Sequence, residues 1–283
     1  MADRGMGTLF VVSTPIGNLG DLSPRAEETL RSVRRILAED TRRTRVLAER
    51  AGSKARLVSL HAHNERERTD TVLGWLADQE NLALVSDAGT PLVSDPGAKL
   101  VAAVLDAGYT VTPIPGPSAV IAALVASGLP SDRFTFLGFP ERKGAARREL
   151  LERVASASET TVLFESPKRL SALLEDLIGS CGPARTVAVA RELTKIHEEV
   201  RRGTLEEVST YYEANPPLGE VTVVVSPAAA HGDEEDRVAD ARALAMELLD
   251  GGMKPSQAAK EVSARLDLAR NAAYRIVHDL SGS

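Results

Sequence analysis

Short apolar runs alternate with amphipathic segments along the first 116 residues of the chain. The apolar, β-branched runs predict strands, and the amphipathic segments between them predict helices. Short strands that alternate with helices are typical of a mostly parallel sheet covered on both faces. The strands are expected within residues 8–14, 35–40, 56–63, 82–87 and 109–116.

Capping residues agree with this pattern. Ser23 is a good N-cap and Pro24 suits the first position of a helix. Asp40 or Thr41 would cap the helix after the second strand, and Asn64 would cap the helix after the third. Each helix is therefore expected to begin just after a strand has ended.

The pattern changes after an apolar helix that starts near Ser118. Strand-like runs now follow one another with few helices between them, which predicts a mixed sheet of α/β or α+β type. Thr204 and Glu207 fit a capping box. The strands are expected within residues 133–139, 159–166, 185–193, 198–203 and 219–226.

Residues 226–236 form a polar stretch rich in small residues, typical of a linker between domains. Residues 237–280 then hold three helical segments, which fit either a helix-turn-helix unit or a plain three-helix cap. We expect an N-terminal α/β domain over 1–116, a second α/β domain over 117–227 and a C-terminal helical domain over 236–283.

The motif Ser-Asp-x-x-Gly occurs twice, in Ser86–Gly89 and again in Ser94–Gly97. The first copy follows the apolar run 82–85 and continues into Thr90-Pro91. It is predicted to be a loop at the carboxyl end of a parallel strand, where ligands of open α/β sheets bind. In the second copy Asp95 is expected to cap a helix that begins with proline, which makes that copy structural.

Composition narrows the class of protein. Charged residues make up 26% of the 283 residues and the net charge is −6, which argues against bulk electrostatic coating of nucleic acid. Arginine clusters within 31–35, 41–45, 141–148 and 167–169 still make a polyanionic ligand worth considering. There is no apolar run long enough to cross a bilayer and no signal-peptide pattern, so a cytoplasmic protein is expected.

The sequence lacks the motifs of several common cofactor and metal sites. The motif around Gly17 lacks the glycine spacing of a dinucleotide site, and the chain has no P-loop. Gly17 indicates either a tight turn with positive φ or a close approach to a ligand. His61 and His63 have no matching third ligand, and the single Cys181 excludes a disulfide, so no metal site is predicted.

A set of longer motifs carries a resemblance to one family. In chain order they are TPIGNLGDLSPRA, AEDTRRT, LHAHNE, LVSDAGTPLVSDPG, PGPSA, GLPSDRFTFLGF, FESPKRL and ARELTK. Together they resemble the ribosomal RNA small subunit methyltransferase I family of the tetrapyrrole-methylase superfamily. Members are S-adenosylmethionine-dependent enzymes that methylate the ribose 2′-hydroxyl of a decoding-region cytidine in 16S rRNA.

The resemblance implies two α/β domains with the cofactor S-adenosylmethionine in the cleft between them, a C-terminal helix-turn-helix unit and a homodimer. It further implies 16S rRNA within the 30S subunit as the partner and no membrane. The residues expected to contact the cofactor are Pro15, Gly17, Asp87, Gly89, Thr90, Ser118, Ala119, Phe164 and Leu193.

Methyl transfer to a hydroxyl needs a group that accepts the hydroxyl proton and a group that positions the RNA. Asp40, His63 and Glu65 are the candidates for the first role, because all three lie at or just after the ends of predicted strands, at one sheet edge. Arg42 is the preferred anchor for a phosphate, with Arg43 and Lys168 as further candidates.

Two other functions fit the sequence. A tetrapyrrole C-methyltransferase would share the fold, since a fold does not fix a substrate. The arginine clusters and the C-terminal unit favour RNA over a planar macrocycle. A non-catalytic RNA-binding or ribosome-associated protein is the third reading, although two large α/β domains exceed what simple binding requires.

Overall fold

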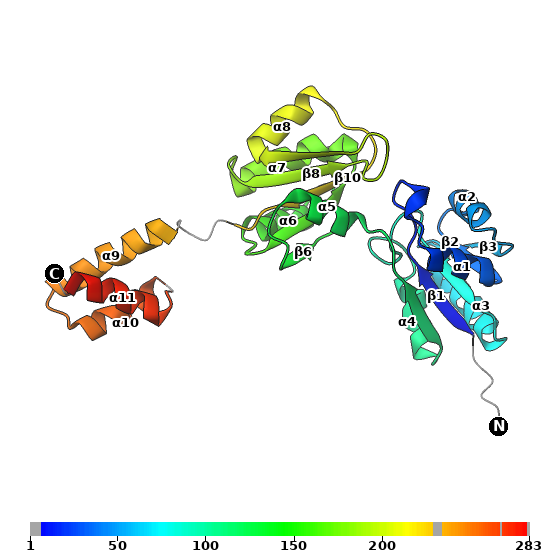
Figure 1. Cartoon of the computed structure of the whole chain (residues 1–283), viewed down its shortest axis with the longest axis horizontal. Coiled ribbons are helices and arrows are strands. Elements are labelled where there is room, and N and C mark those ends of the chain that lie inside the picture. Colours follow the sequence, from blue (N-terminus) through cyan, green and yellow to red (C-terminus); the bar gives the residue numbers. More distant parts are fainter. Residues whose placement is uncertain (1–6, 229–233, 267, 282–283) are drawn as a thin grey trace. The chain divides into compact units, whose positions relative to one another are not determined.

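The computed structural model describes residues 7–228, 234–266 and 268–281. The chain forms two compact units, Met1–Pro227 and Ala228–Ser283, and the first unit contains two five-stranded sheets (Figure 1). Residues 229–233 of the expected linker lie outside the described ranges. The finer division at residues 116 and 117 remains a prediction.

The first sheet is entirely parallel, as the alternating pattern predicts, and its strand order is β3-β2-β4-β1-β5. Its central strand β4 is buried along its whole length, which a sheet covered on both faces requires. The strands are β1 (Thr8–Val12), β2 (Arg35–Ala38), β3 (Arg56–Ser59), β4 (Leu82–Val85) and β5 (Thr110–Ile114).

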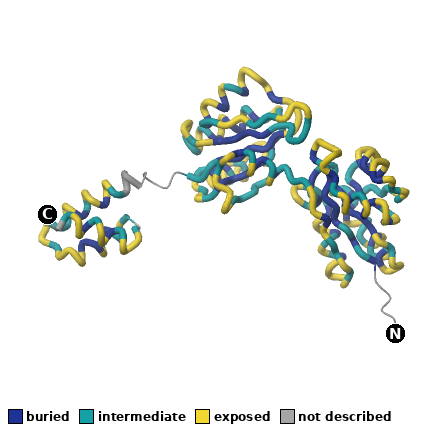
Figure 2. Tube along the Cα trace, viewed as in Figure 1, coloured by how far each residue is buried: buried dark blue, intermediate teal, exposed yellow. Residues whose placement is uncertain are grey.

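Helices cover both faces of this sheet. Ala83 and Val85 of β4 pack with α1 (Pro24–Ser32) and α2 (Thr41–Arg50) on one face. Leu82 and Leu84 point the other way and pack with α3 (Glu65–Ala77) and α4 (Ala98–Asp106). Figure 2 shows the buried positions concentrated along the strands. A short 3₁₀ helix, η1 (Leu19–Asp21), follows β1.

The second sheet is mixed, as predicted, with the order β6-β7-β10-β8-β9. β6 pairs with β7 in parallel, and the remaining pairs are antiparallel. The strands are β6 (Phe134–Phe136), β7 (Thr160–Glu165), β8 (Thr186–Arg191), β9 (Glu199–Thr204) and β10 (Val221–Val225).

The second sheet is also covered on both faces. One face packs with α6 (Ala145–Ala155), α7 (Leu170–Cys181) and α8 (Leu205–Ala214). The other face packs with α5 (Ala119–Ser127). The 3₁₀ helix η2 (Pro167–Arg169) leads from β7 into α7. The N-terminus of α5 is thus held close to the carboxyl end of β5, at the junction of the two sheets.

Several predicted caps are confirmed. The Ser23 hydroxyl accepts the Ala26 N–H with Pro24 at the first helical position, and the capping box of Thr204 and Glu207 is present. Asp40 caps α2 by accepting the Arg42 N–H. Asn64 occupies the N-cap position of α3, but its side chain does not cap the helix.

The prediction that Asp95 caps α4 is wrong. The helix begins at Ala98, two residues later than Pro96, and its N-cap is Gly97 with φ of 116°. A Cβ on Gly97 would lie 2.8 Å from Leu84 Cδ2 of the central strand. Close packing of this glycine on β4 therefore sets the start of the helix, and Asp95 is left free to face elsewhere.

The second unit consists of α9 (Glu234–Asp250), α10 (Pro255–Arg265) and α11 (Arg270–Ser281), which confirms the three predicted helices. Small residues, among them Ala245, Ala258 and Ala273, form its core with Val262 and Val277. Small side chains let three short helices approach closely. Among the described residues no helix combines the length and the apolar character that a bilayer crossing requires.

Candidate functional site

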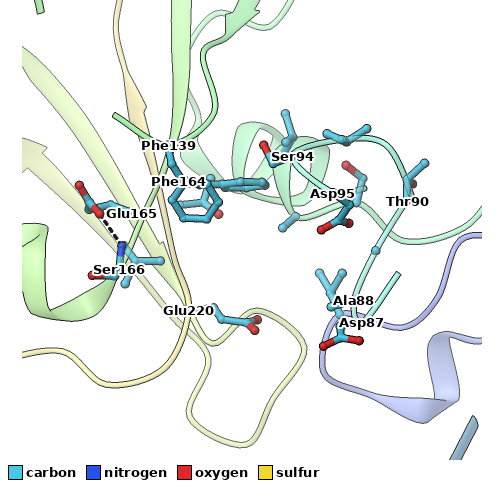
Figure 3. A pocket seen from close by; sticks show the side chains of 18 of the residues that line it. Asp87, Ala88, Thr90, Ser94, Asp95, Phe139, Phe164, Glu165, Ser166 and Glu220 are labelled. Carbon is cyan, nitrogen blue, oxygen red and sulfur yellow. Dashed lines mark hydrogen bonds between the residues drawn. The ribbon is translucent and has the colours of Figure 1, made fainter. Parts of the chain in front are cut away.

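A cavity of about 360 Å³ lies in the first unit, where loops of the first sheet face the end of the second (Figure 3). Its volume falls in the range of about 300–1,000 Å³ typical of small-molecule sites. The first sheet contributes Ile16, Arg43 and residues 87–90 and 93–95; the start of α5 contributes 118–120; the second sheet contributes Phe139, 164–167 and 219–222.

The loop after β4 is fixed by backbone pairing with the loop after β1. Gly89 and Thr14 exchange two hydrogen bonds, with N···O distances of 2.8 and 3.0 Å. Gly89 has φ of 80°, and a Cβ there would lie 3.4 Å from Ile16 Cγ2. Thr90 Oγ1 lies 3.0 Å from Ser13 Oγ and donates to the Pro117 carbonyl. The carboxyl ends of three strands of the first sheet thus form one wall of the cavity. Ligands of open α/β sheets bind at this end of the strands.

Carboxylates gather behind this wall. Asp87 Oδ1 accepts the Asp40 N–H at 3.0 Å, and its Oδ2 lies 3.4 Å from Arg43 Nη1. Burial and the nearby Asp87 raise the pKa of Glu39. Burial also raises the pKa of Asp95 to about 6, with Glu39 and Asp87 adding to the rise and a hydrogen bond from Ser86 opposing it. Perturbed carboxylates inside a cleft are typical of functional sites.

The second sheet supplies an aromatic wall. The ring of Phe164 lies 4.9 Å from that of Phe136 and 5.4 Å from that of Phe139, in tilted edge-to-face arrangements. Beside it Glu165 is buried, accepts the Ser166 N–H at 2.7 Å and pairs with Arg169 at 2.5 Å. The aromatic face and the paired carboxylate are both visible opposite the 87–95 segment in Figure 3.

Backbone strain is concentrated in two segments of the first unit. Among the described residues, five that are not glycine have positive φ, and four of these are Leu92, Ser94, Glu192 and Thr194. Such conformations cost about 1–3 kcal/mol each and cluster at ligand sites. The first pair belongs to the cavity loop, and the second pair lies in the segment that leads away from β8.

Six of the residues predicted to bind the cofactor lie together in the cavity wall: Asp87, Gly89, Thr90, Ser118, Ala119 and Phe164. Pro15 lines a smaller neighbouring cavity of about 140 Å³, which shares Arg43 and Asp87 with the main one. Leu193 packs into the apolar cluster with Phe164 instead of lining the cavity. These six residues are therefore brought together from three separate motifs.

Gly17 has a different role from either one expected. Its φ is not positive, and a Cβ there would lie 2.9 Å from both the Leu193 carbonyl oxygen and Thr194 Oγ1. The absence of a side chain thus allows the loop after β1 to approach the loop after β8. This close approach is to backbone and side-chain atoms of the loop after β8 and not to the cavity.

None of the four predicted catalytic residues is among those that line the cavity. The side-chain hydrogen bond from Arg42 holds the pKa of Asp40 well below its usual range, so Asp40 is a weak proton acceptor. His63 is exposed, with its ring 6.0 Å from that of His61. In the described part of the chain, no group of three or more histidine, cysteine or acidic side chains could hold a metal ion.

Glu65, the remaining candidate, is buried, and its Oε1 accepts the Leu100 N–H of α4 at 2.9 Å. We expect Glu65→Ala to lower the free energy of unfolding by about 1–3 kcal/mol, because this amide would lose its acceptor in a buried setting. Urea denaturation measures the change. Glu67→Ala, at an exposed position of the same helix, should change stability by less than about 0.5 kcal/mol. Unchanged stability with lost methyl transfer would instead support catalysis by Glu65.

Sequence reasoning missed part of the cavity. The Asp-Pro-Gly sequence predicts a helix cap at Asp95, although its motif repeats that of the first loop, and this repetition is the signal that points to the cavity. Gly219–Thr222, at the start of β10, also line the cavity. They carry no motif, and only the pairing of β10 between β7 and β8 brings them there.

The fold and the cleft define the class of the protein. Residues 8–209 match the family model described as Tetrapyrrole (Corrin/Porphyrin) Methylases. Solved structures share the fold at low identity. Uroporphyrin-III C-methyltransferase from Thermus thermophilus has a TM-score of 0.56 and 21% identity, covering 77% of this chain and 94% of that chain. Cobalt precorrin-4 methyltransferase has a TM-score of 0.61 and 16% identity, over 77% and 94% of the two chains.

Closer relatives define the family. Proteins named ribosomal RNA small subunit methyltransferase I are 44% identical in Synechocystis sp., over 97% of this chain and 99% of theirs, and 47% identical in Xylella fastidiosa, over 95% and 98%. The relative of that name in Escherichia coli O157:H7 is 42% identical over 99% and 98%. The chain belongs to the ribosomal RNA small subunit methyltransferase I family.

Proposed function

We propose that the protein transfers the methyl group of S-adenosylmethionine to the ribose 2′-hydroxyl of a cytidine in the decoding region of 16S rRNA. The names of relatives at 42–47% identity support methylation of small-subunit rRNA. The observation that carries the proposal is the cavity itself, because it joins the loop after β4, the start of α5 and the aromatic wall of the second sheet.

The cavity residues fit this cofactor. A structural neighbour, uroporphyrin-III C-methyltransferase from Thermus thermophilus, is complexed with S-adenyl homocysteine. Of the charged side chains that line the cavity here, four are carboxylates and one is Arg43, a balance that favours a cationic ligand. The four carboxylates are Asp87, Asp95, Glu165 and Glu220. When bound, S-adenosylmethionine supplies an electrophilic methyl group on a positively charged sulfonium.

Each wall has its own part in holding the cofactor. The backbone around Gly89 and Thr90 is pinned by its pairing with Thr14, so it offers fixed polar groups to a ligand. Ser118 and Ala119 close the cavity at the start of α5, and Phe164 supplies an apolar surface. The chain need not provide a nucleophile of its own, because the acceptor hydroxyl attacks directly; it must orient that hydroxyl and take its proton.

Basic side chains beside the cavity suit the RNA backbone. Arg43 lines the cavity, and Arg42 next to it has a side chain that is 90% exposed. Lys168 is exposed and follows Pro167, which lines the cavity from the second sheet. Guanidinium and ammonium groups bind phosphate oxygens. Because the net charge of the chain is −6, binding should depend on these local contacts and on a shaped RNA surface such as the 30S subunit.

The remaining parts of the proposal concern assembly and location. The protein is proposed to act as a homodimer in the cytoplasm, as the family resemblance implies. The tetrapyrrole C-methyltransferase alternative is supported by the description of the family model and by solved structures at 16–21% identity, which share the fold. Relatives aligned over nearly the whole chain favour rRNA.

A substrate comparison tests the proposed function. Wild-type protein with radiolabelled S-adenosylmethionine is offered isolated 30S subunits, naked 16S rRNA and a uroporphyrinogen-type tetrapyrrole. We expect methylation of 30S subunits above that of naked rRNA, with the label at a ribose 2′-oxygen of a decoding-region cytidine. Label in the tetrapyrrole and none in RNA would replace the proposed function with the alternative enzyme. If calorimetry detects no binding of S-adenosylmethionine, both methyltransferase functions are ruled out.

A further inference from the structure

We propose that Phe139 and the basic segment 141–148 form a surface that binds single-stranded RNA beside the cavity, an inference that rests on the proposed function. Phe139 belongs to the loop after β6 and lines the cavity next to Phe164 (Figure 3). The segment 141–148 continues from this loop into the start of α6. The phosphate anchors proposed above lie on α2 and η2, so this surface is separate from them.

The ring of Phe139 is exposed, although it is a large apolar group. The residue is 54% exposed, whereas Phe164 is partly buried. The two rings lie 5.4 Å apart and are tilted by 53°, so Phe139 packs against its neighbour and still presents surface to solvent. A single exposed apolar residue is common on proteins, and its surroundings therefore decide how this one is interpreted.

The backbone is held on both sides of Phe139. Before it, the Gly138 carbonyl accepts the Phe164 N–H at 2.9 Å. After it, the Glu141 carbonyl accepts a hydrogen bond from Arg147 Nη1 at 2.9 Å. An aromatic side chain on a fixed loop loses little conformational freedom when a ligand stacks on it. The loop is thus organised in advance for a flat partner.

Basic side chains next to this loop are available to a polyanion. The segment 141–148 carries four basic residues and a single acid in a chain whose net charge is −6. One of the four, Arg147, pairs with Asp176 at 2.6 Å and so holds the segment in place. The others are exposed and have no ion pair within 4 Å in the part of the chain that the structure describes. These three are Arg142, Lys143 and Arg148.

The combination of ring and charges favours RNA over other partners. Single-stranded nucleic acids bind to aromatic side chains that stack on their bases and to positive groups that follow their phosphates. Arg142 and Lys143 follow Phe139 by three and four positions. A base can therefore stack on the ring while the adjoining phosphates contact the cations. The RNA chain would enter the cavity along the loop after β6.

Phe139→Ala tests the aromatic part, with Leu105→Ala as its control. Leu105 of α4 is also 54% exposed, so both changes remove an equally exposed apolar side chain. We expect Phe139→Ala to bind isolated 30S subunits about fivefold more weakly or worse in filter binding. Cofactor affinity by calorimetry should stay within about threefold of wild type. Phe139→Tyr, which keeps the ring, should recover most of the RNA affinity, and Leu105→Ala should match wild type.

A double variant tests the basic part. Arg142→Ala with Lys143→Ala is compared with Lys54→Ala with Arg56→Ala, which removes the same charge from exposed positions at the start of β3. The first pair should lower the slope of log affinity against log salt concentration by about 0.7 for each lost phosphate contact. The control pair should leave the slope unchanged. Filter binding of 30S subunits at several salt concentrations measures both.

The outcomes distinguish this surface from other roles. Wild-type RNA binding by either Phe139→Ala or the Arg142 and Lys143 double variant would overturn the proposal, and so would equal slope changes in the two double variants. A loss of cofactor affinity without loss of RNA affinity would assign Phe139 to the cofactor and overturn it too. So would a change of oligomeric state in light scattering, which would place Phe139 between two copies of the chain.

Failure of the proposed function gives a different result. A wild-type protein that binds 30S subunits through Phe139 but methylates no ribose would overturn the proposed function and still support the surface. An active wild type whose Phe139→Ala variant binds 30S subunits normally would overturn the surface alone.

Discussion

Gly89→Val is expected to lower the affinity of the protein for S-adenosylmethionine at least tenfold, which corresponds to about 1.4 kcal/mol. Gly89 has φ of 80°, a conformation in which a β-branched residue is a genuine outlier. Its Cβ would lie 3.4 Å from Ile16 Cγ2, in a loop already pinned to Thr14. The left-handed backbone and the additional methyl groups of valine disfavour the native conformation of this loop, so we expect Asp87 and Thr90 to move with it. Calorimetric titration of the cofactor measures the loss.

Gly108→Val is the matched control for this change. Gly108 has φ of 82°, almost the same as Gly89, but a Cβ there would meet nothing within 4 Å. The two variants therefore introduce similar backbone strain, and both should lose stability. Only Gly89→Val should lose cofactor affinity. Equal affinities in the two folded variants would show that the loop after β4 does not hold the cofactor.

Arg42→Ala is expected to weaken binding of the 30S subunit several-fold and to reduce the salt dependence of that binding. Loss of one phosphate contact lowers the slope of log affinity against log salt concentration by about 0.7–1. The fold should survive, because the Asp40 carboxylate still accepts the backbone N–H of residue 42. Filter binding at several salt concentrations measures affinity and slope together.

Arg34→Ala serves as the control for Arg42→Ala. Arg34 precedes β2 and Arg42 follows it, so the two arginines lie at opposite ends of one strand. Both side chains are well exposed, 77% and 90%, and each lies near a carboxylate. We expect Arg34→Ala to leave the affinity and its salt slope unchanged. Equal effects of the two substitutions would argue for a diffuse electrostatic attraction and against a phosphate anchor beside the cavity.

The parallel sheet and the loop at Ser86–Gly89 were predictable because both depend on local signals. The apolar run of β4 is buried on both faces, and it ends where the polar loop begins. In a parallel sheet such ends meet at one edge, so a motif read along the chain also places residues in space. The position of the loop at a strand end therefore predicts the part of the cavity wall that comes from Asp87, Gly89 and Thr90.

Other residues lie where the sequence pattern does not predict them, because their positions depend on packing that no local pattern encodes. The sequence places Asp95 at a helix cap, but close packing of Gly97 on Leu84 delays the start of the helix to Ala98. Glu65 follows a strand, as expected of a site residue, yet its side chain turns inward to the Leu100 N–H. The start of β10 reaches the cavity only because β10 pairs between β7 and β8. Periodicity shows that strands exist, whereas their order within a mixed sheet depends on long-range pairing.

A crystal structure of the wild-type protein with S-adenosylhomocysteine tests the central claim most directly. The account predicts that the ligand lies in the cavity and contacts the backbone at Gly89 and Thr90 on one side and Phe164 on the other. A ligand bound elsewhere on the protein, with the wall formed by Gly89, Ser118 and Phe164 untouched, would contradict it.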